Sequence, residues 1–212
     1  FFLVLGVQCL LALLDVGHML GMFVFEQCKS LFELIDGDLP RFVQLQNLAL
    51  VLVSQSCDGR IMRAVRCGEQ VAVYGDYDVD GVTASTVMED TLRLAGIPQD
   101  NIAIMLPDRF ADGYGMSPRL IKRAKACGAT LVITVDCGSR NHAIIDELNI
   151  LGIDTIVTDH HECGDSLPAA VAVVNPKRPD YVDTKAGLKN LAGVGVAFKL
   201  AQGLVQAGLI PA

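Results

Sequence analysis

The chain has 212 residues, 51% of them hydrophobic, and a formal net charge of −7 at pH 7. A chain of this length and apolar content can bury a sizeable core, which excludes disorder over most of its length. The negative charge gives no general attraction to nucleic acid, so any contact with phosphate groups has to be local and assisted by metal ions. The 7 cysteines include no Cys-x-x-Cys pair, which argues against a disulfide framework or a zinc ribbon and favours a reducing cytoplasm.

The N-terminal segment, residues 1–58, is predicted to be a divergent apolar and helical part of the chain. It starts at Phe1 without an initiator methionine, so we expect a fragment of a longer protein. It lacks the basic start and cleavage site of a signal peptide, and it reaches the roughly 20 apolar residues of a membrane helix only by including Asp15. We expect a buried helix or an atypical terminus, with a membrane anchor or chimeric sequence as alternatives.

From residue 59 onward the sequence predicts alternating helices and strands. Helices are expected at 60–67, 82–95, 118–127 and 141–151, where apolar residues recur at helical spacing. Strands are expected at 71–75, 102–106, 131–135, 153–157 and 171–174, which are short apolar runs. This alternation is typical of βαβ units, so we predict an α/β domain over residues 59–212, with a mainly parallel sheet covered by helices on both faces.

An acidic loop follows the first predicted strand, with Asp76, Asp78 and Asp80 at every second position and Gly81 at its end. Carboxylates this close repel one another and would hold protons unless a cation lies among them. One alternative is a solvated turn, and another is an EF-hand, whose first, third, fifth and sixth positions these residues match. The EF-hand fails because its twelfth position is Val87 instead of glutamate, and because a strand precedes the loop. The loop therefore indicates a metal site.

Similar residue types follow the other predicted strands: Asp108 and Arg109 after the second, Asp136 after the third, and Asp159, His160 and His161 after the fourth. In open α/β sheets the ligand crevice lies beyond the carboxyl ends of the strands, so these groups are expected to meet at one edge. Each also has an ordinary explanation. Asp136 could cap the next helix, Arg109 could be a solvated charge, and the residues from Asp159 onward could form a capped turn. Together they favour metal-dependent hydrolysis of phosphoesters.

A glycine-rich run, Gly193-Val194-Gly195-Val196, precedes the last helical stretch. It resembles a phosphate-binding loop, but a lone Gly-x-Gly is a weak signal. Close packing of a helix is the better explanation.

Four segments together resemble the N-terminal motifs of the DHH phosphoesterase superfamily: Tyr74-Gly75-Asp76-Tyr77-Asp78-Val79-Asp80-Gly81, Leu106-Pro107-Asp108-Arg109 with Gly113-Tyr114-Gly115, Asp136-Cys137-Gly138 and Thr158-Asp159-His160-His161. Two further runs, Val173-Val174-Asn175-Pro176-Lys177 and residues 191–200, are similar to the RecJ branch of this superfamily, which comprises single-strand-specific 5′-to-3′ DNA exonucleases. The resemblance extends over residues 60–207, and the order and spacing of the motifs agree.

The resemblance implies two divalent cations, manganese or magnesium, bound by carboxylates and one histidine. It assigns the metal ligands to Asp76, Asp78, Asp80, Asp136 and His160, with Asp136 placed to bridge the ions and Asp76 either a ligand or one layer further out. It assigns catalytic roles to Asp136, Asp159 and His161, and substrate binding to Arg109 and His161. In this scheme Asp159 orients a histidine, His161 contacts the scissile phosphate and Arg109 holds a phosphate. Oxygen ligands with one imidazole suit manganese or magnesium better than zinc.

The function implied by this resemblance is hydrolysis of single-stranded DNA in DNA repair and recombination, in the cytoplasm, with repair and recombination proteins as partners and no membrane association. One alternative is a phosphodiesterase for short oligonucleotides or cyclic dinucleotides, although those relatives carry a histidine where this chain has Tyr74 and Gly75. Another is a DHH-fold scaffold without activity. In the family a further metal-binding aspartate follows the helix that matches residues 196–206, beyond Ala212. We therefore expect a DHH domain incomplete at its C-terminus, with weakened metal binding and little nuclease activity.

Overall fold

The computed structural model describes residues 55–108, 115–180 and 188–211. Their elements, in chain order, are α4 (Gln55–Cys67), β1 (Val71–Tyr74), α5 (Val79–Leu94), the 3-10 helix η1 (Gln99–Asn101), β2 (Ile102–Met105), α6 (Pro118–Ala126), β3 (Leu131–Val135), α7 (His142–Ile150), β4 (Asp154–Thr158), β5 (Ala172–Val174), the 3-10 helix η2 (Leu188–Asn190) and α8 (Gly193–Gln206). Every helix and strand predicted between residues 60 and 174 is present. No helix in these ranges has both the length and the apolar character needed to cross a membrane.

The predicted N-terminal segment lies outside the described residues except for its last few, which form the beginning of α4. The predicted domain boundary after residue 58 therefore falls inside this helix.

The five strands form one parallel sheet in the order β2-β1-β3-β4-β5, which confirms the predicted fold class. Val71 at the start of β1 pairs with Ile102 of β2 on one side and with Leu131 of β3 on the other. The chain runs from β1 to β2 and then crosses back to β3, so the strand order reverses between β1 and β3. Ligand crevices in open α/β sheets form at such a reversal, beyond the carboxyl ends of the strands.

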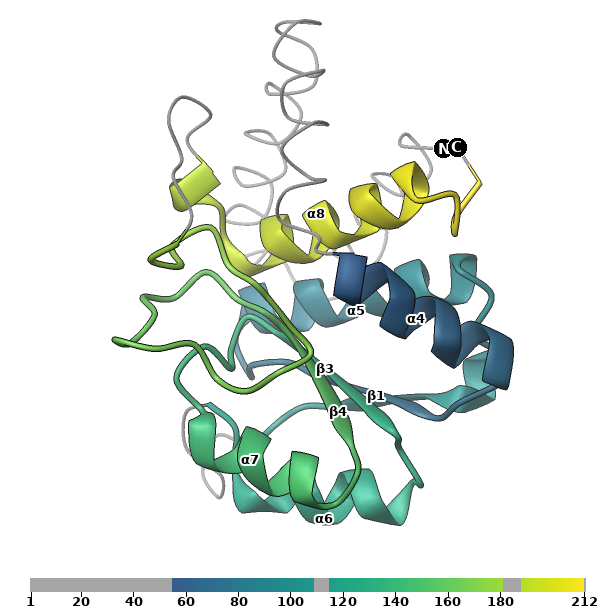
Figure 1. Cartoon of the computed structure of the whole chain (residues 1–212), viewed down its shortest axis with the longest axis horizontal. Coiled ribbons are helices and arrows are strands. Elements are labelled where there is room, and N and C mark those ends of the chain that lie inside the picture. Colours follow the sequence, from purple (N-terminus) through teal and green to yellow (C-terminus); the bar gives the residue numbers. More distant parts are fainter. Residues whose placement is uncertain (1–54, 109–114, 181–187, 212) are drawn as a thin grey trace, which may run out of the picture.

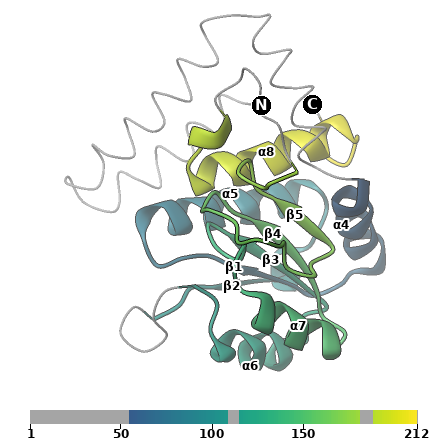
Figure 2. The same ribbon diagram turned by 60° about the vertical axis from the view of Figure 1, so that its left-hand side comes forward.

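Helices cover both faces of the sheet, with α4, α5 and α8 on one face and α6 and α7 on the other (Figures 1 and 2). Side chains alternate between the two faces along a strand, so β1 contributes to both layers. Val71 and Val73 belong to the core cluster beneath α5 and α8, and Ala72 and Tyr74 to the cluster beneath α6 and α7. All four residues of β1 are buried, as expected for a central parallel strand.

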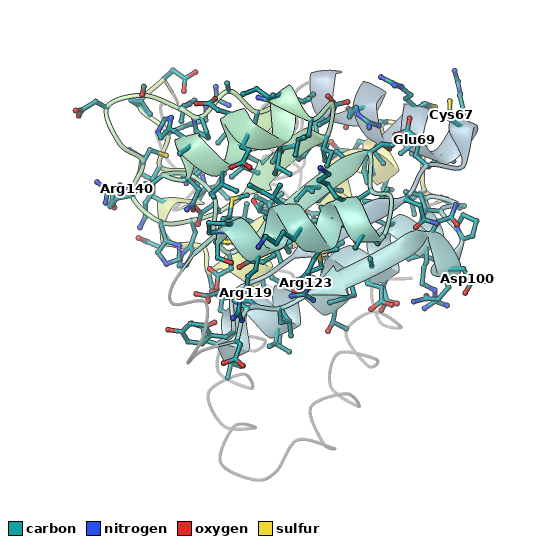
Figure 3. The ribbon with its side chains drawn as sticks, turned by 90° about the horizontal axis from the view of Figure 1, so that it is seen from below. Cys67, Glu69, Asp100, Arg119, Arg123 and Arg140 are labelled. Atoms are coloured by element: carbon teal, nitrogen blue, oxygen red, sulfur yellow. The ribbon has the colours of Figure 1, made fainter. Side chains whose placement is uncertain are left out.

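The strands of the parallel sheet begin at one side of the molecule and end at the other. Figure 3 shows Arg140, which follows β3, on one side, and Glu69, which precedes β1, on the other. On the Glu69 side, the buried Arg60 of α4 donates hydrogen bonds to Glu69 at 2.7 Å, to Asp154 at 2.5 Å and to the carbonyl of Thr130 at 3.1 Å. This network fixes α4 to the beginnings of the strands, and the predicted site residues follow the strands at the other edge.

Candidate metal centre

The acidic loop after β1 runs directly into α5, which begins at Val79, before the third aspartate, and not after Gly81 as predicted. The reason is the Asp78 carboxylate, which caps the helix by accepting a hydrogen bond from the Gly81 amide at 3.0 Å. Asp80 therefore lies in the first turn of the helix. A Cβ atom on Gly81 would lie 2.5 Å from the backbone nitrogen and oxygen of Asp76, so only glycine lets this turn pack against the loop.

Asp76 is only 2% exposed, so the alternative of a solvated turn is wrong for this residue. Its Oδ1 accepts a hydrogen bond from the Tyr77 amide at 2.7 Å. Burial raises its pKa, and the nearby Asp78 carboxylate adds to this effect. The carboxylate is therefore held in a position where ionisation is costly, as expected of a group that faces a cation.

The carboxylate of Asp80 accepts hydrogen bonds from the N-terminus of α8. Oδ2 accepts a hydrogen bond from the Gly193 amide at 2.7 Å, and Oδ1 accepts one from the Val194 amide at 2.8 Å. A Cβ atom on Gly193 would lie 2.6 Å from Cβ and Cγ of Asp136, which confirms close packing as the explanation of this glycine. The amides that a phosphate-binding loop would offer to a ligand are thus paired with a protein carboxylate.

Asp136 occupies a strained position at the end of β3. Its φ angle of 61° is the one positive value among the non-glycine residues that the structure describes. Its amide donates to the carbonyl of Thr158 at 2.9 Å, which holds it against the end of β4. The N-cap of α7 is Asn141, so the explanation of Asp136 as a helix cap is wrong. Strain of this kind is concentrated at functional sites, where the surrounding structure maintains it.

The buried Asp136 carboxylate faces His160. Nε2 of His160 lies 3.0 Å from Oδ1 of Asp136 and 3.7 Å from Oδ2 of Asp80. The closer approach is an ion pair when His160 is protonated, but Oδ1 of Asp136 accepts no well-aligned hydrogen bond from the described residues. Burial raises the pKa of Asp136 to about 6, although His160 acts in the opposite direction. A cation bound between this carboxylate oxygen and the imidazole nitrogen of His160 would give both atoms a partner.

Asp159 is a buried carboxylate of the opposite kind. Oδ1 accepts hydrogen bonds from the amides of His160 and His161, at 2.7 and 3.0 Å, and lies 2.8 Å from Nδ1 of His161. Oδ2 accepts one from the Ser139 amide at 2.9 Å. Burial alone would raise the pKa of Asp159, but the bonds from His161 and Ser139 outweigh it and lower the pKa to about 2.

The capped turn predicted as an alternative at this position is therefore present, and the same carboxylate also holds a histidine ring. The contact with Asp159 raises the pKa of His161. A neutral imidazole that donates from Nδ1 carries its lone pair on Nε2, so this contact also selects the tautomer.

Two residues beside this pair, Ser139 and Asn175, were not predicted as site residues. Asn175, which follows β5, is fully buried, and its Nδ2 donates to Ser139 Oγ at 2.8 Å and to the His161 carbonyl at 2.9 Å. The signal was available in the sequence, because Asn175 is a polar residue directly after a buried apolar strand, as Asp136 and Asp159 are.

The structure brings most of the predicted residues together. The potential ligand atoms of Asp76, Asp78 and Asp136 lie within 4.8 Å of one another, and so do those of Asp136, His160 and His161. Asp136 is common to both groups. Arg109 lies outside the described residues. The donor set of carboxylates with imidazole fits manganese or magnesium, and the buried carboxylates with raised pKa values fit a site that binds a cation.

The fold and this cluster define an α/β domain with a carboxylate and histidine centre at the strand reversal of a parallel sheet. The family model described as the DHH family, N-terminal domain, matches residues 70–211. The chain belongs to the DHH family.

Relatives from several bacteria share this part of the chain. The single-stranded-DNA-specific exonuclease RecJ of Salmonella typhimurium is 46% identical over 140 residues, which are 66% of this chain and 23% of the relative. RecJ of Bacillus subtilis is 44% identical over 149 residues, which are 69% of this chain and 18% of the relative. The chain thus spans about a quarter or less of the length of these curated relatives.

Solved structures of RecJ are among those similar in fold. The crystal structure of exonuclease RecJ bound to manganese has a TM-score of 0.63 and 32% identity, covering 73% of this chain and 37% of that chain. The crystal structure of RecJ from Thermus thermophilus in complex with Mn²⁺ has a TM-score of 0.55 and 31% identity, covering 73% of this chain and 21% of that chain.

Proposed function

We propose that this chain carries the metal centre of an exonuclease that hydrolyses phosphodiester bonds in single-stranded DNA from the 5′ end. The observation that carries the proposal is that two groups of potential metal ligands share the buried Asp136. One group adds Asp76 and Asp78, and the other adds His160 and His161. The names of the relatives supply the substrate, since the curated proteins that match this domain are single-stranded-DNA-specific exonucleases. The 5′-to-3′ direction rests on the resemblance to the RecJ branch alone.

The cofactors that we propose are two divalent cations, Mn²⁺ or Mg²⁺, held by Asp76, Asp78, Asp80, Asp136 and His160. The similar structures were solved with manganese, which supports this choice. Bound cations of this kind lower the pKa of a water molecule and neutralise charge that develops on the phosphate. Asp80 has a second task in the fold, because its oxygens also accept hydrogen bonds from the first amides of α8.

The remaining roles belong to side chains around the centre. Asp159 stays ionised and holds the ring of His161, which contacts the scissile phosphate. Arg109 binds a phosphate of the substrate. We place the protein in DNA repair and recombination in the cytoplasm, with proteins of those processes as partners, and this assignment rests on the resemblance alone.

The test is Mn²⁺-dependent hydrolysis by the full chain of single-stranded DNA labelled at the 5′ or the 3′ end. Duplex DNA and a dinucleotide serve as parallel substrates. Because weak metal binding and little nuclease activity are expected of this chain, any hydrolysis should be slow, and it should release the 5′ label early as a mononucleotide from the single strand only. Asp136→Asn should abolish this release, and Asp146→Asn, which changes an exposed aspartate on α7, should not.

The other outcomes separate the alternative functions. Hydrolysis of the dinucleotide alone would replace the exonuclease with a phosphodiesterase for short oligonucleotides. Binding of Mn²⁺ with no hydrolysis of any substrate would indicate a domain that does not act as an enzyme by itself. Failure to bind Mn²⁺ would contradict the metal centre.

A further inference from the structure

We propose that Asn175 is a positioning residue, whose side-chain amide keeps the Asp159–His161 pair in the orientation needed for hydrolysis. The inference deepens the proposed function and rests on it. Asn175 itself donates no hydrogen bond to a titratable side chain, so its effect would be transmitted through Ser139 and the backbone of His161.

The four residues form a closed ring of hydrogen bonds. Asp159 accepts from the Ser139 amide at 2.9 Å, and Ser139 Oγ accepts from Nδ2 of Asn175 at 2.8 Å. The same Nδ2 donates to the carbonyl of His161 at 2.9 Å, and Nδ1 of His161 lies 2.8 Å from Asp159. The ring thus connects the segments that follow three different strands: β3, β4 and β5.

Burial makes this ring sensitive to the loss of one member. Asn175 is 0% exposed, Ser139 is 1% exposed and Asp159 is 2% exposed. The buried Ser139 hydroxyl cannot recover a lost donor from bulk water, so it either rearranges or stays unpaired. The bond to the His161 carbonyl is partly buried, and its loss acts mainly by freeing the backbone. Loss of the Asn175 amide would therefore release the Ser139 loop and the His161 backbone together, and these are the two segments that hold the ring of His161 against Asp159.

A purely structural role for Asn175 has to be separated from this one. Oδ1 of Asn175 accepts a hydrogen bond from the Lys177 amide at 2.8 Å, which shapes the turn after β5. That bond lies within the turn and involves only the oxygen of the side-chain amide. The two bonds from Nδ2 leave the turn and reach Ser139, which follows β3, and His161, which follows β4.

The experiment compares Asn175→Ala and Ser139→Ala with Val173→Ala in the full chain. Val173→Ala is the matched control, because it trims a buried side chain of β5 and removes no hydrogen bond. Each variant is measured for thermal stability, for kcat and KM on single-stranded DNA with Mn²⁺, and for its histidine ring N–H signals by NMR without metal. The chain has only 4 histidines, so His161→Ala assigns the signal of His161.

We expect Asn175→Ala to lower kcat by about 10- to 100-fold with KM unchanged, as removal of supporting hydrogen bonds around a metal site does. Ser139→Ala should show the same effect at smaller size. The Nδ1–H signal of His161 should be sharp in the unaltered chain and in Val173→Ala, and broadened or lost in Asn175→Ala. The NMR measurement needs neither metal nor activity, so it tests the proposal even where the chain hydrolyses no DNA.

Two results would overturn the proposal. One is a His161 signal in Asn175→Ala that matches the signal in Val173→Ala. The other is a rise in KM with unchanged kcat, which would assign Asn175 to the turn at Lys177 instead.

Discussion

Two aspartates at neighbouring strand ends, Asp136 and Asp159, are both buried and have opposite pKa shifts. Asp159 accepts hydrogen bonds from three amides and lies against a histidine nitrogen, so its charge is compensated within the protein. Oδ1 of Asp136 accepts no well-aligned hydrogen bond in the described part of the chain. Environments that push the pKa values of two carboxylates apart assign them different roles. Here Asp159 supports a histidine, and the raised pKa of Asp136 agrees with the role of metal ligand that we propose for it.

The first prediction concerns Asp159→Asn. The pKa of Asp159 is lowered to about 2, so its ionised form contributes stability above the ordinary carboxyl pKa, and this contribution is lost as the pH falls from about 4 to about 2. We expect the variant to lose on the order of 2 kcal/mol at pH 7 in the absence of metal. Urea unfolding at pH 7 and pH 3 measures this. A loss of the same size at both pH values would show that the charge is not the cause.

Asp136→Asn should have the opposite effect on the metal-free protein. The pKa of Asp136 is raised to about 6, so its ionisation destabilises the folded protein. The protein therefore loses stability as the pH rises from about 4 to about 6. Neutralising the side chain should therefore stabilise the protein at pH 7 by on the order of 1 kcal/mol, while Mn²⁺ binding is lost. Asp146→Asn is the control in the same unfolding assay. A destabilised Asp136→Asn would mean that the 3.0 Å contact with His160 outweighs the cost of burying the charge.

At the scale of the elements, consecutive carboxylates of one loop stabilise two different helices. Asp78 caps α5, its own helix, and Asp80 accepts from the first amides of α8. The amides at a helix N-terminus lack partners within the helix and carry partial positive charge, so a carboxylate there satisfies both needs. The start of α8 is thereby fixed to the start of α5, directly beside Asp136.

Asp80→Asn tests this link without metal. An amide keeps one oxygen acceptor and loses the charge, so one of the bonds to Gly193 and Val194 is weakened or lost. We expect the metal-free variant to be less stable by about 1 kcal/mol, the usual scale of a lost cap. A residue that only binds metal would instead gain stability when neutralised, as predicted for Asp136. Chemical unfolding of the two variants side by side, each in the presence of a chelator, distinguishes these results.

Much of this arrangement could be predicted from the sequence, because in a parallel sheet the residue that follows a strand can be placed once that strand is recognised. The strands are largely apolar, although β4 also contains Asp154, Thr155 and Thr158, and the residue after each strand lies at the same edge as its counterparts. The predicted start of α5 was wrong because Asp78 was interpreted only as a ligand, although aspartate is also a good helix cap. The contact between Asp80 and Gly193 joins residues 113 positions apart, and no local pattern contains it.

For the molecule as a whole, the two edges of the sheet differ in how their charges are compensated. At the edge where the strands begin, Arg60 pairs with Glu69 and Asp154. At the edge where they end, burial raises the pKa values of Asp76 and Asp136. Ionised Asp76 and Asp136 therefore destabilise the fold where the strands end, and a cation bound there would offset this.

The last prediction follows from this asymmetry. A cation that binds only the folded protein stabilises it by about 2.7 kcal/mol at a concentration of about 100 times Kd, so the Tm should rise with Mn²⁺ and return on addition of a chelator. The gain should be larger at pH 7 than at pH 5, because protons on Asp136 and His160, whose pKa values are both raised, compete with the cation. Asp136→Asn should combine the higher metal-free Tm with a loss of the Mn²⁺ response, and Asp146→Asn should keep both unchanged. A Tm shift of equal size at both pH values would place the bound cation elsewhere, because a site built on these residues has to release protons when it binds metal.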